Sequence, residues 1–92
     1  MNWRLRTGQS LRTLAGDDES VVYNDRSGET HLLGAAAVVL LEHLREHPAD
    51  FSSMCLALET AWEFESAFEL QRVVMVLTDE LDALGLIEPS LP

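Results

Sequence analysis

A strand–turn–strand pattern that runs directly into an apolar helix constrains this fold more than any other feature of the sequence. Residues 21–24 (VVYN) alternate as a strand, residues 25–28 (DRSG) form a polar turn, and residues 29–33 (ETHLL) form a second strand. A helical pattern follows with almost no linker. We therefore predict a small α+β domain with one exposed sheet edge, whose unpaired N–H and C=O groups can pair with a peptide.

The residues before this hairpin predict further extended structure. Residues 3–7 (WRLRT) alternate between apolar and polar side chains, which is the period of a half-buried strand. Residues 10–14 predict a second short extended piece, and residues 15–20, with three consecutive acids, predict a solvated loop. We therefore expect a single domain over the chain, with strands in residues 1–33 and helices in residues 34–88.

Two helices are predicted in the middle of the chain. The first spans residues 35–46 and is stopped by Pro48. The side chains that fall on one side of it are Ala37, Leu40, Leu41 and Leu44. The second spans residues 52–62, with Ser52 as the N-cap and Phe51 before it as a hydrophobic staple.

The third helix has the clearest boundaries. Ser66 and Glu69 match a capping box, and Gly85 provides the C-terminal stop. Residues 86–88 then predict a short extended tail. The apolar stripe that this helix can bury consists of Leu70, Val73, Val74, Leu77, Leu81 and Leu84. Three helices after a β element are the outline of a winged helix-turn-helix.

The opposite face of the third helix is also partly apolar. It carries Phe68, Arg72, Met75 and Asp79, with Val76 beside them. One interpretation is that this face covers a second part of the same core, for example the sheet. The other is that it forms one wall of a peptide groove, with Met75 as an adaptable contact. The two agree if the face packs at the sheet edge and leaves a crevice.

Residues that support chemistry are sparse. Cys55 is the only cysteine, so neither an intrachain disulfide nor a thiolate zinc site can form, and its apolar surroundings predict a small buried side chain. His43 and His47 are four residues apart on a helix but lack a third metal ligand. His31 is expected to make a packing or turn contact. With no phosphate loop and no nucleophile triad, we expect no enzyme activity, no metal and no cofactor.

The charge is strongly negative and unevenly distributed. The formal net charge is −10 and the chain has no lysine. Residues 1–33 carry four Arg and five acids, whereas residues 34–92 carry two Arg and eleven acids. The helical part would repel DNA or an anionic membrane and attract a basic partner. The longest apolar run, residues 32–41, is too short to span a bilayer, and residues 1–10 lack a signal-peptide core, so we expect a cytoplasmic protein.

Within residues 21–44 the sequence resembles a known family. The triplet VYN, the segment SGETHLL and the following Ala-rich helix with Val39, Leu40 and Leu44 are similar to the PqqD-like peptide chaperones, also called RiPP recognition elements. The turn from Ser27 to His31 most resembles the branch that accompanies HPr-kinase-related proteins. The later helices fit in order and length.

The resemblance implies a three-stranded antiparallel sheet followed by a three-helix unit that resembles a winged helix. It also implies binding of a precursor leader peptide as a strand beside the third strand and against the third helix. The implied edge consists of Glu29, Thr30, His31, Leu32 and Leu33. The implied wall is the face with Phe68, Arg72, Met75, Val76 and Asp79, where Arg72 would pair with a leader carboxylate. The implied partner is a modifying enzyme or an HPr-kinase-related protein.

Two alternative functions fit the same outline. A winged-helix DNA-binding regulator shares it, but a third helix with a single Arg and several acids does not suit a major groove. A protein–protein adaptor that docks on an enzyme without a peptide substrate also fits. We expect a monomer or a homodimer through the edge at residues 29–33, where a second copy would compete with a peptide.

Overall fold

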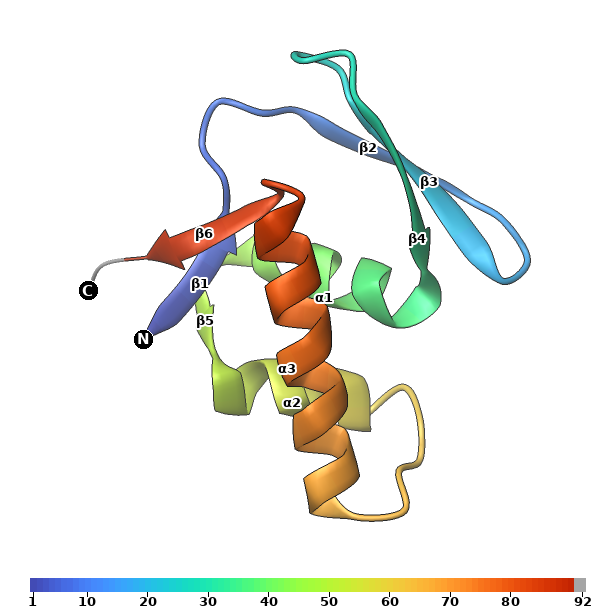
Figure 1. The fold of residues 1–92 in the computed structure, drawn as a ribbon, viewed down its shortest axis with the longest axis vertical. Helices are drawn as coiled ribbons and strands as arrows, with labels where there is room; N and C mark the ends of the chain where they lie inside the picture. The colour runs from blue at the N-terminus through green and yellow to red at the C-terminus, as the bar shows by residue number, and fades with distance from the viewer. Residues whose placement is uncertain (91–92) are drawn as a thin grey trace.

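The chain folds into two separate three-stranded antiparallel sheets and three helices (Figure 1). The structure is a computed structural model and describes residues 1–90. In chain order the elements are β1 (Asn2–Leu5), β2 (Leu11–Ala15), β3 (Glu19–Asn24), β4 (Thr30–Gly34), α1 (Ala35–Glu46), β5 (Ala49–Asp50), α2 (Phe51–Glu59), α3 (Ala67–Ala83) and β6 (Ile87–Ser90). The predicted α+β class, with a three-stranded antiparallel sheet ahead of three helices, is confirmed.

The sheet β2–β3–β4 contains the predicted hairpin and extends away from α2 and α3 (Figure 1). Its inner face contributes Leu11, Val22 and Leu33 to the core, and Val22 is fully buried. Its outer face exposes Leu14 and Leu32, which flank Val21 in register across the three strands. The alternation of the sequence therefore marks the buried and the exposed face of this sheet correctly.

The predicted first strand forms, but it belongs to the other sheet and not to the sheet of the hairpin. β1 pairs with β5 on one side and with β6 on the other. The C-terminal tail returns to it after α3, and Arg6 N donates a hydrogen bond of 3.0 Å to Leu86 O. A salt bridge of 2.7 Å joins Arg4 to Glu88 across the pair. This pairing links the two ends of the chain, so no local pattern reveals it.

The first two helices differ in how well the sequence predicts them. The bounds of α1 are as predicted. The predicted start and N-cap of α2 are wrong, because the side chain of Asp50 accepts a 2.9 Å hydrogen bond from Ser53 N and Phe51 is already helical. α2 also ends earlier, at Glu59, where the Thr60 hydroxyl donates to a carbonyl of the last turn. The start of α2 is therefore set by Asp50, whose short side chain caps the amide three residues later in the chain.

The boundaries of α3 follow the prediction with one change. Ser66 Oγ accepts a 3.1 Å hydrogen bond from Glu69 N, which confirms the N-cap. The Glu69 carboxylate accepts from Glu65 N at 3.0 Å instead of from the N-cap amide. Gly85, with a φ of 76°, ends the helix in the left-handed region. Leu84 was predicted to be buried but is 40 % exposed, because the chain turns away at Gly85.

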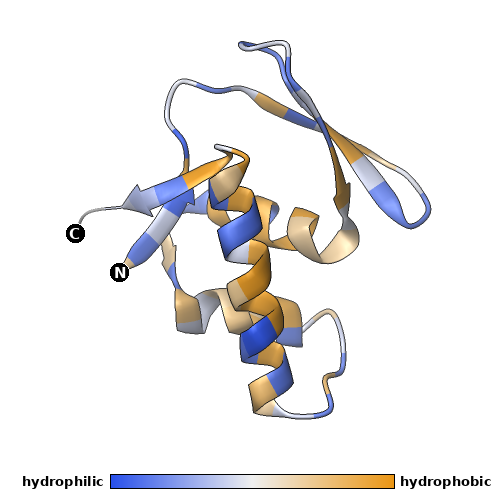
Figure 2. Ribbon diagram, in the orientation of Figure 1, coloured by the Kyte–Doolittle hydropathy of each residue, from blue (hydrophilic) through white to orange (hydrophobic). Residues whose placement is uncertain are grey.

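The core lies where α1, α2 and α3 meet the inner faces of both sheets. Its fully buried large side chains are Leu40, Met54, Leu58, Leu81, Leu86, Ile87, Val22 and Val74. Apolar and polar residues alternate around α3 (Figure 2), so one side of the helix packs on the core and the other faces outward. None of the helices in residues 1–90 has the combined length and apolar character needed to cross a membrane.

Candidate functional site

The outer edge of β4 carries unpaired backbone groups. Asn24 N donates a 2.8 Å hydrogen bond to Glu29 O, which makes these two residues a hydrogen-bonded pair at the start of the β3–β4 ladder. Hydrogen-bonded and non-hydrogen-bonded pairs alternate along an antiparallel ladder. The residues of β4 that therefore turn their backbone groups away from β3 are Thr30, Leu32 and Gly34.

The other side of β3 supports this assignment. Asp25 N donates to Ser10 O at 2.8 Å, so Val21 and Tyr23 form their backbone hydrogen bonds with β2. Alternate residues of β3 thus bond to opposite neighbours, as a central strand requires. β4 has no strand partner on its other side within residues 1–90, and Thr30, Leu32 and Gly34 are all exposed. The edge predicted from the hairpin is therefore open.

Two hollows lie near the ends of β4: His31 of β4 lines one, and Ala35 and Ala36, which follow β4 directly, line the other. The hollow at its beginning, of about 310 Å³, is polar and lies between the β3–β4 turn and the end of α3; its lining includes Arg6, Gln9, Asn24, Glu29, His31 and Leu84. The hollow at its end, of about 400 Å³, is lined by Ala35, Ala36, Trp62, Glu63, Phe64, Glu69 and Val73. One of these hollows includes the C-cap of α3, Leu84, and the other includes Glu69 and Val73 of α3.

Hydrogen bonds fix the positions of the segments that line the polar hollow. Asn24 Oδ1 accepts from the amides of Ser10, Arg26 and Ser27 at 3.4, 3.1 and 3.4 Å, which anchors the hairpin turn. Gln9 Nε2 donates to Leu86 O at 2.7 Å and connects the β1–β2 loop to the end of α3.

The same hollow has one free cation. A Cβ atom added at Gly85 would lie 3.0 Å from Arg6 Nη1, so the glycine makes room for the guanidinium at the C-terminal end of α3. Arg6 forms no ion pair with any residue in the described part of the chain. It complements the helix dipole there and leaves a positive charge beside the start of β4.

The predicted strand residues reach the site in different ways. Thr30 and Leu32 face the open edge with their backbone groups. Glu29 and His31 turn their backbone groups toward β3 but line the polar hollow with their side chains. Leu33 is 5 % exposed and belongs to the core.

The residues of the predicted wall on α3 lie on different sides of the helix. Its five residues, Phe68, Arg72, Met75, Val76 and Asp79, are all exposed. Val73 lines the hollow beside β4, and Val76 lies about 60° around the helix from it. Phe68 and Met75 lie about 140° and about 160° from Val73, on the far side of α3. That the five bind a peptide stays a prediction; the helical residues found beside β4 are Glu69, Val73 and Leu84, which the sequence reading assigned to the cap and the core.

The side chains with potential for chemistry form no catalytic or metal-binding cluster in the described residues, although the rings of His43 and His47 meet edge to face with centroids 5.7 Å apart. His43 Nε2 is 2.8 Å from Ser53 Oγ, and His47 Nδ1 donates to Pro48 O at 3.0 Å, so each ring has a partner of its own. Residues 1–90 contain no group of three or more His, Cys, Asp or Glu side chains placed to hold a metal ion. Burial raises the pKa of the half-buried Cys55 thiol, and the nearby Glu59 carboxylate raises it further. This cysteine is therefore a poor nucleophile at neutral pH.

Comparisons with known proteins identify a shared fold. No family model matches the sequence, and no curated protein matches it significantly. The structure of TbiB1 in complex with the TbiA(beta) leader peptide superposes with a TM-score of 0.70 and 16 % sequence identity, over 97 % of this chain and 99 % of that chain. The protein thus has the fold of TbiB1 along almost its whole length.

Proposed function

We propose that this protein binds the leader segment of a ribosomally made precursor peptide as an added strand on β4. The observation that carries the proposal is the open edge, where Thr30, Leu32 and Gly34 direct backbone groups away from β3. The shared fold with TbiB1, which is in complex with a leader peptide, supports the same assignment. The bound peptide would then be presented to a modifying enzyme or an HPr-kinase-related protein.

The binding would combine a sequence-independent part with a selective part. The N–H and C=O groups of Thr30 and Leu32, with the N–H of Gly34, form main-chain hydrogen bonds to any extended peptide. Alternate side chains of that peptide face the space between β4 and α3, where Val73 and Leu84 offer apolar contacts. Main-chain hydrogen bonds that do not depend on side chains, combined with two hollows, therefore suit peptides that differ in sequence.

Charges at the two hollows would refine the choice of peptide. Arg6 at the beginning of β4 suits a leader carboxylate, and Glu69 in the hollow after its end suits a leader lysine or arginine. Because Arg6 lines the hollow and Arg72 lies about 100° around α3 from Val73, Arg6 is the better placed partner for a carboxylate.

Fluorescence polarisation with leader segments of short open reading frames encoded beside the gene tests this function. We expect one leader to bind with low-micromolar or tighter affinity and its scrambled form not to bind. Binding that is equal for native and scrambled sequences would contradict a recognition role. Binding of duplex DNA at low salt in place of any leader would favour the regulator alternative.

A proline scan of the two sheet edges locates the binding strand. Leu32→Pro removes a donor that faces the open edge, where proline is tolerated, so the variant should fold and lose leader binding. Thr13→Pro is the matched control, because Thr13 turns its N–H toward the opposite edge of the same sheet. Leader binding that survives Leu32→Pro but not Thr13→Pro would place the peptide on β2 instead.

A further inference from the structure

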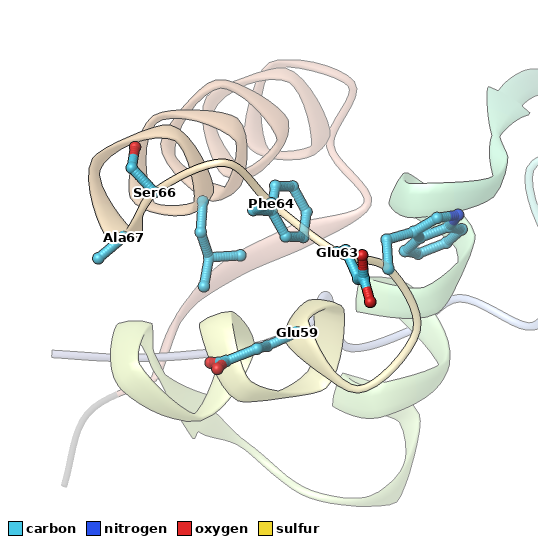
Figure 3. Close-up of a pocket in the computed structure, with 7 residues that line it drawn as sticks. Glu59, Glu63, Phe64, Ser66 and Ala67 are labelled. Atoms are coloured by element: carbon cyan, nitrogen blue, oxygen red, sulfur yellow. The ribbon is translucent and has the colours of Figure 1, made fainter.

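A wedge lies between α2 and the first turns of α3, and no residue of β4 lines it. It consists of two hollows, of about 480 and about 360 Å³, that share Glu59, Ala67 and Leu70. Figure 3 shows the larger hollow, with Glu59 on α2 across from Phe64 in the connecting loop and Ala67 at the start of α3. Gln71, which lines the wedge, lies about 160° around α3 from Val73, which lines the hollow beside β4.

The wedge is apolar at its base and at its rim. Phe51 and Cys55 line it as half-buried side chains, and Leu70 closes its base. Leu56, also a lining residue, is 61 % exposed, and Phe68 is 75 % exposed one residue after Ala67. Large apolar side chains held this far into water around a concave surface are typical of a contact surface for another molecule.

The charge of the wedge has one sign. The segment from Asp50 to Gln71 has five carboxylates, those of Asp50, Glu59, Glu63, Glu65 and Glu69, and no Lys, Arg or His. Asp50 and Glu69 accept hydrogen bonds from the starts of α2 and α3. Glu59 and Glu63 line the larger hollow, and neither has a hydrogen-bond or ion-pair partner among residues 1–90. These two carboxylates favour an occupant with basic side chains.

The walls of the wedge determine the backbone of its occupant. α2 and α3 use their amides and carbonyls in their own helical hydrogen bonds, so neither wall can pair with an added strand. An occupant must satisfy its backbone by itself, and a helix does so. α2 has nine residues, which corresponds to a contact of about two to three turns.

We propose that the wedge binds a basic amphipathic helix of a partner protein, with apolar side chains in the two hollows and lysine or arginine against Glu59 and Glu63. No residue of β4 lines the wedge, so the partner does not occupy the edge strand, although the larger hollow shares Trp62, Glu63 and Phe64 with the hollow just after β4. Phe68, which is 75 % exposed and follows the lining residue Ala67, would add apolar contact area at the rim. The proposal holds whether or not β4 binds a leader.

A pair of synthetic helices tests the proposal on the intact protein. The probe is a helical peptide of about 15 residues made of Leu, Ala and Lys with one apolar face, and its control has Glu in place of every Lys. We expect the Lys peptide to bind, to slow alkylation of Cys55 at fixed pH, and to shift amide signals of α2 and α3 in NMR spectra. We expect the Glu peptide to do none of these.

Variants separate the wedge from a general attraction to an acidic protein. Glu59→Gln combined with Glu63→Gln should weaken the Lys peptide about tenfold, as measured by fluorescence polarisation. Leu56→Ser, at an exposed position, should also weaken it. Glu46→Gln removes one exposed carboxylate on α1 outside the wedge and should leave the affinity unchanged.

Three results would overturn the proposal. These are equal binding of the Lys and Glu peptides, binding of the Lys peptide without protection of Cys55, and no binding of either peptide. Shifted signals confined to β4 would count as the second of these results. Leader binding is measured on the same samples, so failure of the wedge and failure of the β4 proposal are distinguished.

Discussion

The outer strands β4 and β6 of the two sheets differ in the backbone groups that they leave open for pairing. In the sheet β2–β3–β4 the outer strand offers amides and carbonyls at Thr30 and Leu32. In the sheet β5–β1–β6 the bond from Arg6 N to Leu86 O sets an alternation in which Ile87 and Pro89 turn away from β1. Pro89 therefore removes a donor where β6 would present one. A proline on an edge strand is a common protection against unwanted pairing, and β4 has no such protection.

The outer strands of the two sheets also differ in burial. Ile87 of β6 is 1 % exposed and packs in the core, whereas Leu32 of β4 is 63 % exposed. β6 holds the two ends of the chain together, and β4 remains available at the surface. The outer strand of one sheet therefore contributes to stability, and the outer strand of the other is open to the peptide binding that we propose.

The largest expected effect is the difference in unfolding free energy between a substitution in β6 and a substitution in β4. Ile87→Ala leaves a cavity in the core and should lower the free energy of unfolding by about 2–5 kcal/mol. Leu32→Ala at an exposed position should change it by less than about 0.5 kcal/mol. Urea denaturation followed by circular dichroism measures both. Similar losses for the two variants would mean that β4 is as much a part of the core as β6.

A smaller effect tests the direction of the backbone groups in β4. His31→Pro removes a donor that faces β3 and leaves the opposite carbonyl of buried Val22 without its partner, at a cost of about 1–3 kcal/mol. Leu32→Pro removes a donor that faces outward and should cost clearly less. Thermal unfolding of the two variants decides the point. A larger loss for Leu32→Pro would reverse the assignment of the edge.

Local signals in the sequence were sufficient for the hairpin, for α1 and for the cap of α3. Each depends on residues within a few positions of one another, such as Ser66 and the amide of Glu69. The open edge followed from the same local pattern, because a hairpin that leads into a helix leaves its second strand with one free side. The start of α2 was missed because Asp50 and Ser52 both qualify as N-caps by residue type.

Features that depend on contacts between distant residues could not be predicted from the sequence. The pairing of β1 with β6 joins Arg4 to Glu88, and no periodicity connects residues so far apart. On α3 the period identifies which side is buried but not which flank lies beside β4. For that reason the sequence leaves open whether the exposed face with Phe68 lines a peptide groove or another surface, and Val73 of the apolar stripe lines the hollow just after β4.

The smallest effect compares one ion pair from each sheet. Arg4 and Glu88 lie opposite each other in β1 and β6 at 2.7 Å, with the Glu88 side chain 27 % exposed. Arg12 and Asp25 lie at 3.3 Å and are more exposed. Glu88→Gln keeps the shape and removes the charge, so the free energy of unfolding should fall by up to about 1 kcal/mol, less at high salt. Asp25→Asn should cause no resolvable change.

The reason for the difference is the place of each pair in the fold. The Arg4–Glu88 pair spans the strands that bring the two chain ends together, so its partners are already held in register and lose little side-chain entropy when they pair. The Arg12–Asp25 pair joins the start of β2 to a solvated turn. Urea denaturation of both variants at low and high salt measures the two effects. An equal or larger loss of stability for Asp25→Asn would show that the β2–β3–β4 sheet depends on its surface charges as much as the β5–β1–β6 sheet does. The two sheets would then not differ in their electrostatic contribution to stability.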